Sequence, residues 1–186
     1  MRLAVCSAKG GVGKTSTAAN LAAVLATRGR VLAVDADPQD SLGRAVGVVA
    51  KGREDSLAGL LKDPDADLRA AVRVDVAPGL DLLPAHPSLE AVGVALASQG
   101  GLLTGIRRVA CSLWDKEGMA AREVAGALAG TDLPLLTTRI PLSRRVPSST
   151  LAKRPVVLSA RRSSVTQAFV ALAEELLASH AEKVHP

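Results

Sequence analysis

The chain has 186 residues, of which 48% are hydrophobic and 22% are charged. This length is typical of one domain, and the composition supplies a core and argues against disorder. Aromatic residues make up only 1% of the chain and Tyr is absent, so an aromatic surface that stacks nucleic-acid bases is excluded. Lys plus Arg outnumber Asp plus Glu by 23 to 18, and the net charge of +5 permits a polyanionic partner.

Targeting and metal-binding patterns are missing from the sequence. Cys6 and Cys111 lie far apart, and the three histidines do not have the spacing of metal ligands. The apolar run at the N-terminus is too short for a signal peptide, and no segment supplies about twenty unbroken apolar residues. We therefore expect a cytoplasmic protein.

The first predicted elements form a strand, a helix and a second strand. Residues 3–7 are apolar and lead into Gly-rich sequence, as a buried parallel strand does before a phosphate loop. Residues 15–27 place apolar side chains at helical spacing, and Gly29 marks the end of that helix. Residues 31–34 predict a second buried strand. This order is the βαβ unit of a parallel sheet.

The rest of the chain continues to alternate strands and helices. It therefore predicts an α/β fold, a mostly parallel sheet with flanking helices. Residues 72–76 and 80–83 alternate as two strands joined by the turn at 77–79. The other expected elements are helices at 56–61, 88–98, 119–129 and 165–181, strands at 109–114 and 133–140, and basic, Ser-rich loops at 143–149 and 159–164.

The segment 8–16, Ala-Lys-Gly-Gly-Val-Gly-Lys-Thr-Ser, is typical of a phosphate-binding loop. Its glycines let backbone N–H groups converge on phosphate oxygens, and Lys14 supplies a positive charge to the β and γ phosphates. The Thr15 hydroxyl can bind Mg²⁺ at the N-terminus of the helix. The first position holds Ala8 in place of the usual Gly, and Lys9 is an additional lysine inside the loop. A simple glycine-rich turn is the alternative, but the flanking strand and helix favour nucleotide binding.

Residues 35–39, Asp-Ala-Asp-Pro-Gln, follow the second strand and strengthen this interpretation. The phosphate-binding loop at 8–16, with Lys9 as an additional lysine, has the form called a deviant Walker A loop. Together with residues 35–39 it makes the chain resemble the ParA family of partition ATPases, relatives of MinD. Segments at 80–89, 109–115 and 140–156 are also similar to the family, although Ser148 and Ser149 replace a common Glu-Ala pair. The resemblance implies one P-loop NTPase-like domain over residues 1–186 that binds ATP and Mg²⁺.

The sequence departs from the family between residues 85 and 108. At this place the family carries a Walker B strand that ends in an Asp-x-x-Pro-Pro type motif, followed by a helix, a strand and another helix. Two strand-helix units of about thirty residues each are therefore missing here. We expect an incomplete fold and slow or absent ATP turnover, because the Mg²⁺ ion loses a supporting group.

The resemblance also implies roles for individual residues. Lys9 would reach across a nucleotide-sandwiched dimer to the partner's phosphates, Asp37 would position the attacking water, and Asp35 would support Mg²⁺ through water. The alternatives are a solvated lysine and two carboxylates that cap turns. The implied catalytic residues are Lys9, Lys14 and Asp37, and the implied nucleotide contacts are Gly10, Gly11, Val12, Gly13, Lys14, Thr15, Ser16 and Pro141.

The C-terminal third of the chain is rich in arginine. By the resemblance, arginines in this half contact DNA without sequence preference, although a solvated basic loop is equally compatible with the pattern. The last helix carries Glu174 and Glu175 and lacks a basic, apolar face, so a MinD-like membrane role is not expected. The candidate DNA contacts are Arg144, Arg145, Arg161 and Arg162.

The leading hypothesis is a ParA-type ATPase of chromosome or plasmid partitioning that is associated with the nucleoid. It would form a homodimer around ATP, bind DNA non-specifically and work with a ParB-like centromere-binding partner. A second hypothesis is a truncated, non-hydrolysing regulatory protein that pairs with an intact relative, which the shortened centre favours. A third is a small-molecule ligase or kinase related to dethiobiotin synthetase, against which residues 35–39 and the basic segments argue.

Overall fold

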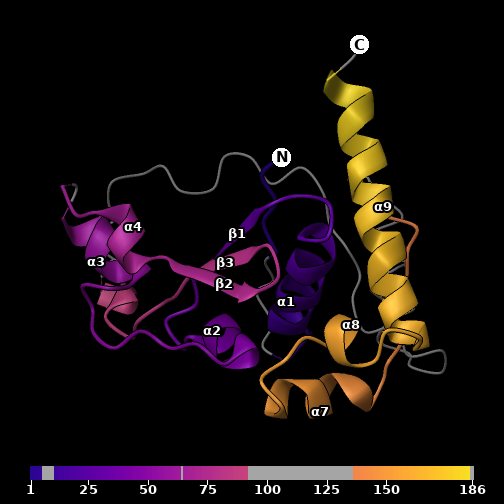
Figure 1. The fold of residues 1–186 in the computed structure, drawn as a ribbon, viewed down its shortest axis with the longest axis horizontal. Coiled ribbons are helices and arrows are strands. Elements are labelled where there is room, and N and C mark those ends of the chain that lie inside the picture. The colour runs from indigo at the N-terminus through magenta and orange to yellow at the C-terminus, as the bar shows by residue number, and fades with distance from the viewer. Residues whose placement is uncertain (6–10, 64, 92–135, 185–186) are drawn as a thin grey trace.

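The computed structural model describes residues 1–5, 11–63, 65–91 and 136–184. Within these residues the sheet lies at the centre, with the two short helices α3 and α4 at one end and the long helix α9 at the other (Figure 1). The elements in chain order are α1 (Lys14–Leu25), β1 (Val31–Val34), α2 (Ser41–Val46), α3 (Leu57–Lys62), α4 (Leu68–Ala71), β2 (Arg73–Ala77), β3 (Leu80–Leu83), α7 (Arg145–Leu151), α8 (Val156–Ser159) and α9 (Ser164–Val184).

The described sheet has three strands in the order β1-β3-β2. β1 and β3 are parallel, with Val31 opposite Leu80 and Val34 opposite Leu83. A tight turn at Pro78 and Gly79 leads from β2 into β3, and the two strands run antiparallel. The described sheet is therefore mixed, and the α/β architecture expected from the sequence is confirmed.

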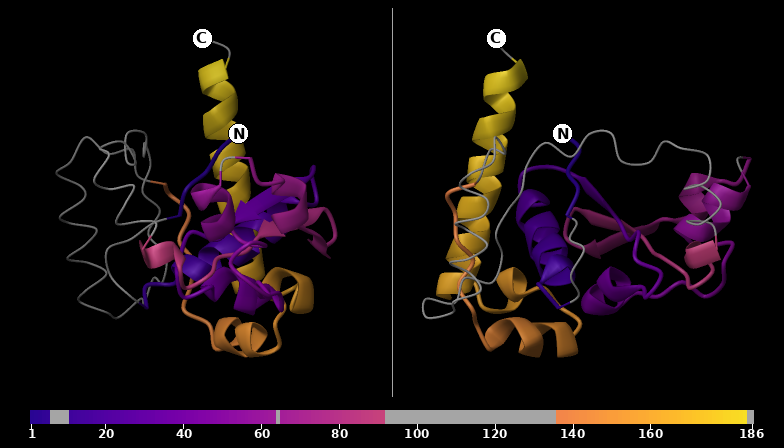
Figure 2. Two further views of the ribbon diagram at one scale, coloured as in Figure 1. Left: turned by 90° about the vertical axis from the view of Figure 1, so that its left-hand side faces the viewer. Right: turned by 180° about the vertical axis from the view of Figure 1, so that it is seen from behind.

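The main core forms where α1 packs against α9 beside the sheet. The right-hand view of Figure 2 shows these two helices side by side. Leu21 and Phe169 are almost fully buried in it, and Leu80 joins them from β3. The chain's single phenylalanine is thus the largest buried side chain among the described residues. An exposed ion pair of 2.9 Å between Arg28 and Glu174 also links the end of α1 to α9.

A smaller core holds α2 against α1 and the sheet. Leu42 and Val46 of α2 pack with Ala19 of α1 and Leu82 of β3. β1 and α2 both contact α1, and the loop of residues 35–40 joins them. The acidic loop is therefore held between two elements that pack on the first helix.

Most of the elements expected in the first half and the last helix are confirmed. The helix expected at 15–27 is α1, and the strand at 31–34 is β1. The short helix at 56–61 is α3, and the helix at 165–181 is α9. The paired strands joined by the turn at 77–79 are β2 and β3.

Three expectations were wrong within the described residues. Of the buried strand expected at 3–7, residues 3–5 form no strand, and Leu3 and Val5 are exposed. Residues 136–140 form no strand either, because the N–H groups of Thr137 and Thr138 donate to the Glu175 carboxylate of α9. The segment 143–149, expected as a loop, contributes most of helix α7.

Several other expectations lie outside the described residues. They concern the strand at 109–114, the helix at 119–129, most of the helix at 88–98 and the shortened centre after residue 91. Residues 89–91 begin a helix as expected. In the part of the chain that the structure covers, no helix has the length and apolar composition needed to cross a membrane.

Candidate nucleotide-binding site

The site begins at the N-terminus of α1. Gly11 and Gly13 have φ angles of +75° and +89°, a region that glycine enters without strain. The Thr17 N–H donates to the Gly13 carbonyl at 2.8 Å, which starts the helix. The N-cap residue Gly13 has no side chain to cap this terminus, and the first turn contains no acidic residue. The positive end of the α1 dipole is therefore suited to an anion.

The backbone before α1 also leaves room for a ligand. A Cβ atom built on Gly11 would meet no heavy atom within 4 Å. Lys14, Thr15 and Ser16 are half-buried at the start of the helix, so each side chain keeps some access to solvent. An open glycine backbone, a lysine and a hydroxyl at a helix N-terminus fit a phosphate group and its Mg²⁺ ion. Lys9 and Gly10 lie outside the described residues.

Asp35 fastens the acidic loop to α2. One carboxylate oxygen accepts the Asp37 N–H at 3.0 Å, and the other accepts the N–H groups of Leu42 and Gly43 at 2.9 and 3.3 Å. Asp35 is only 3% exposed, and this burial raises the pKa of its carboxyl despite the three hydrogen bonds. The Asp35 carboxylate thus caps the turn and the start of α2, which was the alternative to a role at Mg²⁺. Its support of Mg²⁺ through water stays a prediction.

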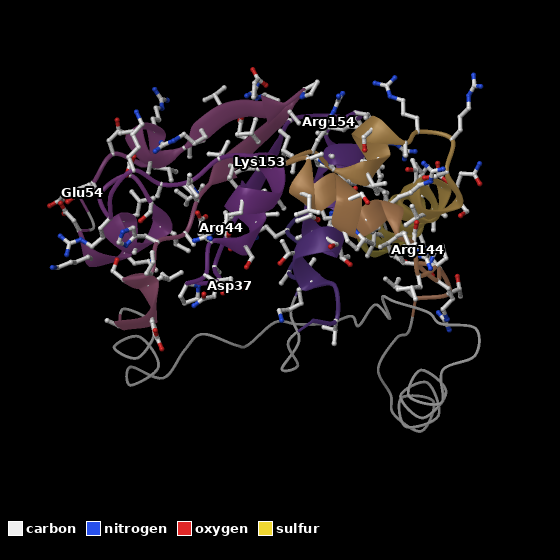
Figure 3. The ribbon with its side chains drawn as sticks, turned by 90° about the horizontal axis from the view of Figure 1, so that it is seen from below. Asp37, Arg44, Glu54, Arg144, Lys153 and Arg154 are labelled. Atoms are coloured by element: carbon white, nitrogen blue, oxygen red, sulfur yellow. The ribbon has the colours of Figure 1, made fainter. Side chains whose placement is uncertain are left out.

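Asp37 lies on the same loop but closer to solvent. Its Oδ1 accepts the Gln39 N–H at 3.0 Å, and the residue is half-buried. In the view of Figure 3, Asp37 lies on the loop and Arg44 on the helix that follows it. A half-buried carboxylate keeps the accessibility that positioning a water molecule requires.

The sequence interpretation missed Asp40. Its φ angle of +52° is unusual for a residue other than glycine, and its side chain is 4% exposed. Its Oδ1 has no hydrogen-bond partner. Burial, followed by the negative charge of Asp35, raises the pKa of Asp40 to about 6. Its place directly before Ser41 and Leu42, the start of α2, was the available signal, but it does not reveal burial.

Asn20 was missed as well. It is 3% exposed on α1, and its side chain joins the first turn of that helix to α8. A polar residue among the apolar positions of residues 18–24 was the only signal in the sequence. Pro141, the expected contact of the adenine, is half-buried beside the buried Ile140, which packs in the same core as Leu21.

The four arginines expected at DNA are all exposed, but they come from two places. Arg144 and Arg145 lie at the start of α7, and Arg161 and Arg162 lie in the turn between α8 and α9. Figure 3 shows α7 from below, with Arg144 labelled there. Exposure satisfies the first requirement of a phosphate-contacting surface.

Comparison with known proteins supports the nucleotide-binding interpretation. A family model described as "AAA domain" matches residues 1–108. The chromosome partitioning protein ParA of Caulobacter vibrioides is 42% identical over 95 residues, which are 50% of this chain and 35% of that protein. The sporulation initiation inhibitor protein Soj of Bacillus subtilis is 38% identical over 95 residues, 50% of this chain and 37% of Soj. The matched part thus spans about a third of the length of these relatives.

Solved structures agree over most of the described fold. Apo McdA of Cyanthece matches with a TM-score of 0.75 and 19% identity, over 92% of this chain and 97% of that chain. The septum site-determining protein MinD of Pyrococcus horikoshii, complexed with Mg-ADP, matches with a TM-score of 0.66 and 25% identity. This second match covers 91% of this chain and 93% of that chain. The chain belongs to the ParA/MinD family of P-loop ATPases.

Proposed function

We propose that this chain binds ATP with Mg²⁺ at the N-terminus of α1 and acts in chromosome or plasmid partitioning. The carrying observation is the α1 terminus itself, which follows two glycines of positive φ, has no acidic residue in its first turn and begins with Lys14. The MinD relative complexed with Mg-ADP supports the choice of ligand. The partitioning role rests on the 42% identity with the Caulobacter ParA protein over half of this chain.

Each proposed role either stabilises charge on the phosphates or positions a group that takes part in phosphoryl transfer. Lys14 stabilises negative charge on the terminal phosphates, and the Thr15 hydroxyl is a ligand for Mg²⁺. Asp37 orients the attacking water, and Asp35 supports the ion through water while it holds the loop to α2. Lys9 serves the phosphates of the partner in a nucleotide-dependent homodimer.

We also propose that the assembled protein binds nucleoid DNA through Arg144, Arg145, Arg161 and Arg162 and responds to a ParB-like partner. These exposed arginines offer phosphate contacts without base reading. We expect slow hydrolysis, because the sequence between residues 85 and 108 offers no match to the Walker B carboxylate that the resemblance implies for ordering the metal. A regulatory protein that binds ATP and pairs with an intact relative remains the second candidate, supported by the same absence.

The decisive test is ATP binding by Lys14→Ala. Loss of the cation over the terminal phosphates should weaken ATP binding at least about tenfold, which is about 1.4 kcal/mol. The measurement is isothermal titration with Mg²⁺ present, and Lys51→Ala removes an exposed lysine elsewhere as the matched control. Equal ATP affinity in the parent and in Lys14→Ala would refute the proposed site.

A further inference from the structure

Residues 136–140 have the side-chain pattern of a strand without forming one. Leu136 and Ile140 at the two ends are buried in the main core, while Thr137 and Arg139 between them are exposed. Successive side chains of a strand point to opposite faces, and three of the five residues here are β-branched, which favours a strand. The backbone is nevertheless not a strand. Its conformation must therefore be held by other contacts.

The Glu175 carboxylate of α9 binds two successive N–H groups of this segment. Its Oε1 atom accepts the N–H and the hydroxyl of Thr137, the hydroxyl at 2.9 Å, and its Oε2 atom accepts the Thr138 N–H at 2.9 Å. Successive N–H groups of a strand point to opposite edges, so two that converge on one carboxylate exclude a strand here. Burial of Glu175 opposes its charge, but the hydrogen bonds from Thr138 and Thr137 lower the pKa of its carboxyl to about 2. The carboxylate is therefore charged at neutral pH.

Arg139 binds the carbonyl groups of the same segment. Its Nη1 atom donates to the Leu136 carbonyl at 2.7 Å and to the Thr137 carbonyl at 3.1 Å. Glu175 thus takes N–H groups, and Arg139 takes carbonyl groups, that a neighbouring strand would otherwise bind. Charged side chains commonly protect a strand edge from pairing with another chain. In this chain they close the segment to such pairing.

We propose that residues 136–140 are a latent pairing strand for a second copy of this chain, and that Glu175 keeps this strand closed. A second copy fits because antiparallel pairing centred on Thr138 is self-complementary. It sets Arg139 of one copy opposite Thr137 of the other, so the two exposed cations do not face each other. The buried side chains of each copy stay in their own core. No nucleotide takes part, so the inference stands apart from the proposed ATP binding.

The test is sedimentation equilibrium of the full chain at several protein concentrations, without nucleotide. In Glu175→Gln the amide nitrogen cannot accept the Thr138 N–H, so the segment should open and the dissociation constant for self-association should fall at least about tenfold. The matched control is Glu174→Gln, which removes the neighbouring charge and its exposed 2.9 Å contact with Arg28, and it should associate as the parent does. In Glu175→Gln, hydrogen exchange should show that amides of residues 136–140 gain protection as the protein concentration rises.

Proline substitutions test whether the segment itself makes the contact. Successive N–H groups lie at opposite edges of a strand, so either Thr137→Pro or Thr138→Pro removes an N–H from the paired edge. In the Glu175→Gln background, at least one of the two should return self-association to the parent level. If Glu175→Gln does not keep the native circular dichroism spectrum, Thr137→Val takes its place, because it removes only the hydroxyl donor, and it should tighten self-association by a smaller factor.

The outcomes separate the latent strand from other causes of association. Equal association of Glu175→Gln and Glu174→Gln would overturn the inference. Tighter association without added protection in residues 136–140 would also overturn it, as would a lack of effect of both prolines. Where Thr137→Val is the variant used, an unchanged dissociation constant has the same meaning.

Discussion

Asp40 combines three features that each cost free energy in the folded protein. The backbone is left-handed, the carboxyl is buried, and one oxygen lacks a hydrogen-bond partner. Strained and unsatisfied groups concentrate at working sites, and this residue lies between Asp37 and the start of α2. The loop therefore carries a stability cost next to Asp37, for which a role in orienting the attacking water is proposed.

The charge of Asp40 makes stability depend on pH in a defined direction. Its pKa of about 6 in the folded protein is above the ordinary 3.8, so the native state binds the proton more strongly than the unfolded state. The free energy of unfolding should fall as pH rises from 4 to 6, by up to about 3 kcal/mol. Asp40→Asn should therefore be more stable than the parent at pH 8 and similar to it at pH 4.

Urea unfolding at pH 4 and pH 8 measures this difference. Asp65→Asn removes the same charge from an exposed position and should shift the free energy of unfolding much less. A stability difference between Asp40→Asn and the parent that is the same at both pH values would contradict the assignment of the effect to a buried charge.

At the level of single residues, the sequence predicted where Lys14 and Thr15 lie, at the start of the helix that follows the glycines. A glycine-rich loop before a helix has a fixed geometry, so this position could be read locally, while their roles at a nucleotide stay predictions. Asn20 and Asp40 could not be recognised, because their roles depend on partners or burial that arise only on folding. Val157, which donates to Asn20, is 137 positions away in the chain.

At the level of elements, α2 depends on a glycine. A Cβ atom on Gly43 would press against the Asp40 carboxylate and the Val48 carbonyl oxygen, closer than real Cβ atoms approach. The Gly43 N–H also donates to Asp35. Gly43→Ala should therefore destabilise the protein by about 1–3 kcal/mol, since overpacking displaces backbone here.

The control for Gly43→Ala is Gly29→Ala. A Cβ atom there meets nothing within 4 Å, and the φ angle is not positive, so stability should stay equal or rise by about 0.4–1 kcal/mol. Thermal unfolding of both variants gives the comparison. Similar stability of the two variants would show that α2 adjusts to the added methyl group.

The elements that the sequence predicted well are long or strictly alternating. α1 and α9 bury periodic apolar faces, and β2 and β3 alternate around a Pro-Gly turn. α7 was missed because Ser and Pro suggested a loop. In the structure the hydroxyls of Ser148 and Ser149 donate to carbonyls of the preceding turn, and this satisfies them within the helix.

At the level of the whole molecule, the net charge of +5 and the exposed arginines give a prediction for DNA binding. Affinity for duplex DNA should fall steeply with salt, because binding to phosphates releases counterions. Arg161→Ala combined with Arg162→Ala should reduce the slope of log affinity against log salt by about 2 if both contact phosphates.

The control variants lie at the opposite end of the molecule, where α3 and α4 are found (Figure 1). Lys62→Ala combined with Arg69→Ala removes the same charge from exposed positions there and should leave the slope nearly unchanged. Equal slopes for the two double variants would mean that the net charge, and not the turn between α8 and α9, controls binding.

The packing of α1 against α9 has a consequence for the order of events during synthesis. α1 is translated well before α9, yet α9 covers part of its apolar face. At about 5–20 residues per second, roughly ten seconds separate the translation of the two helices. During that interval Leu21 and its apolar neighbours on α1 are not yet covered by α9. The nascent chain therefore exposes an apolar surface on the helix at which the phosphate site is proposed. Chaperone capture is therefore expected to be strongest before α9 is translated.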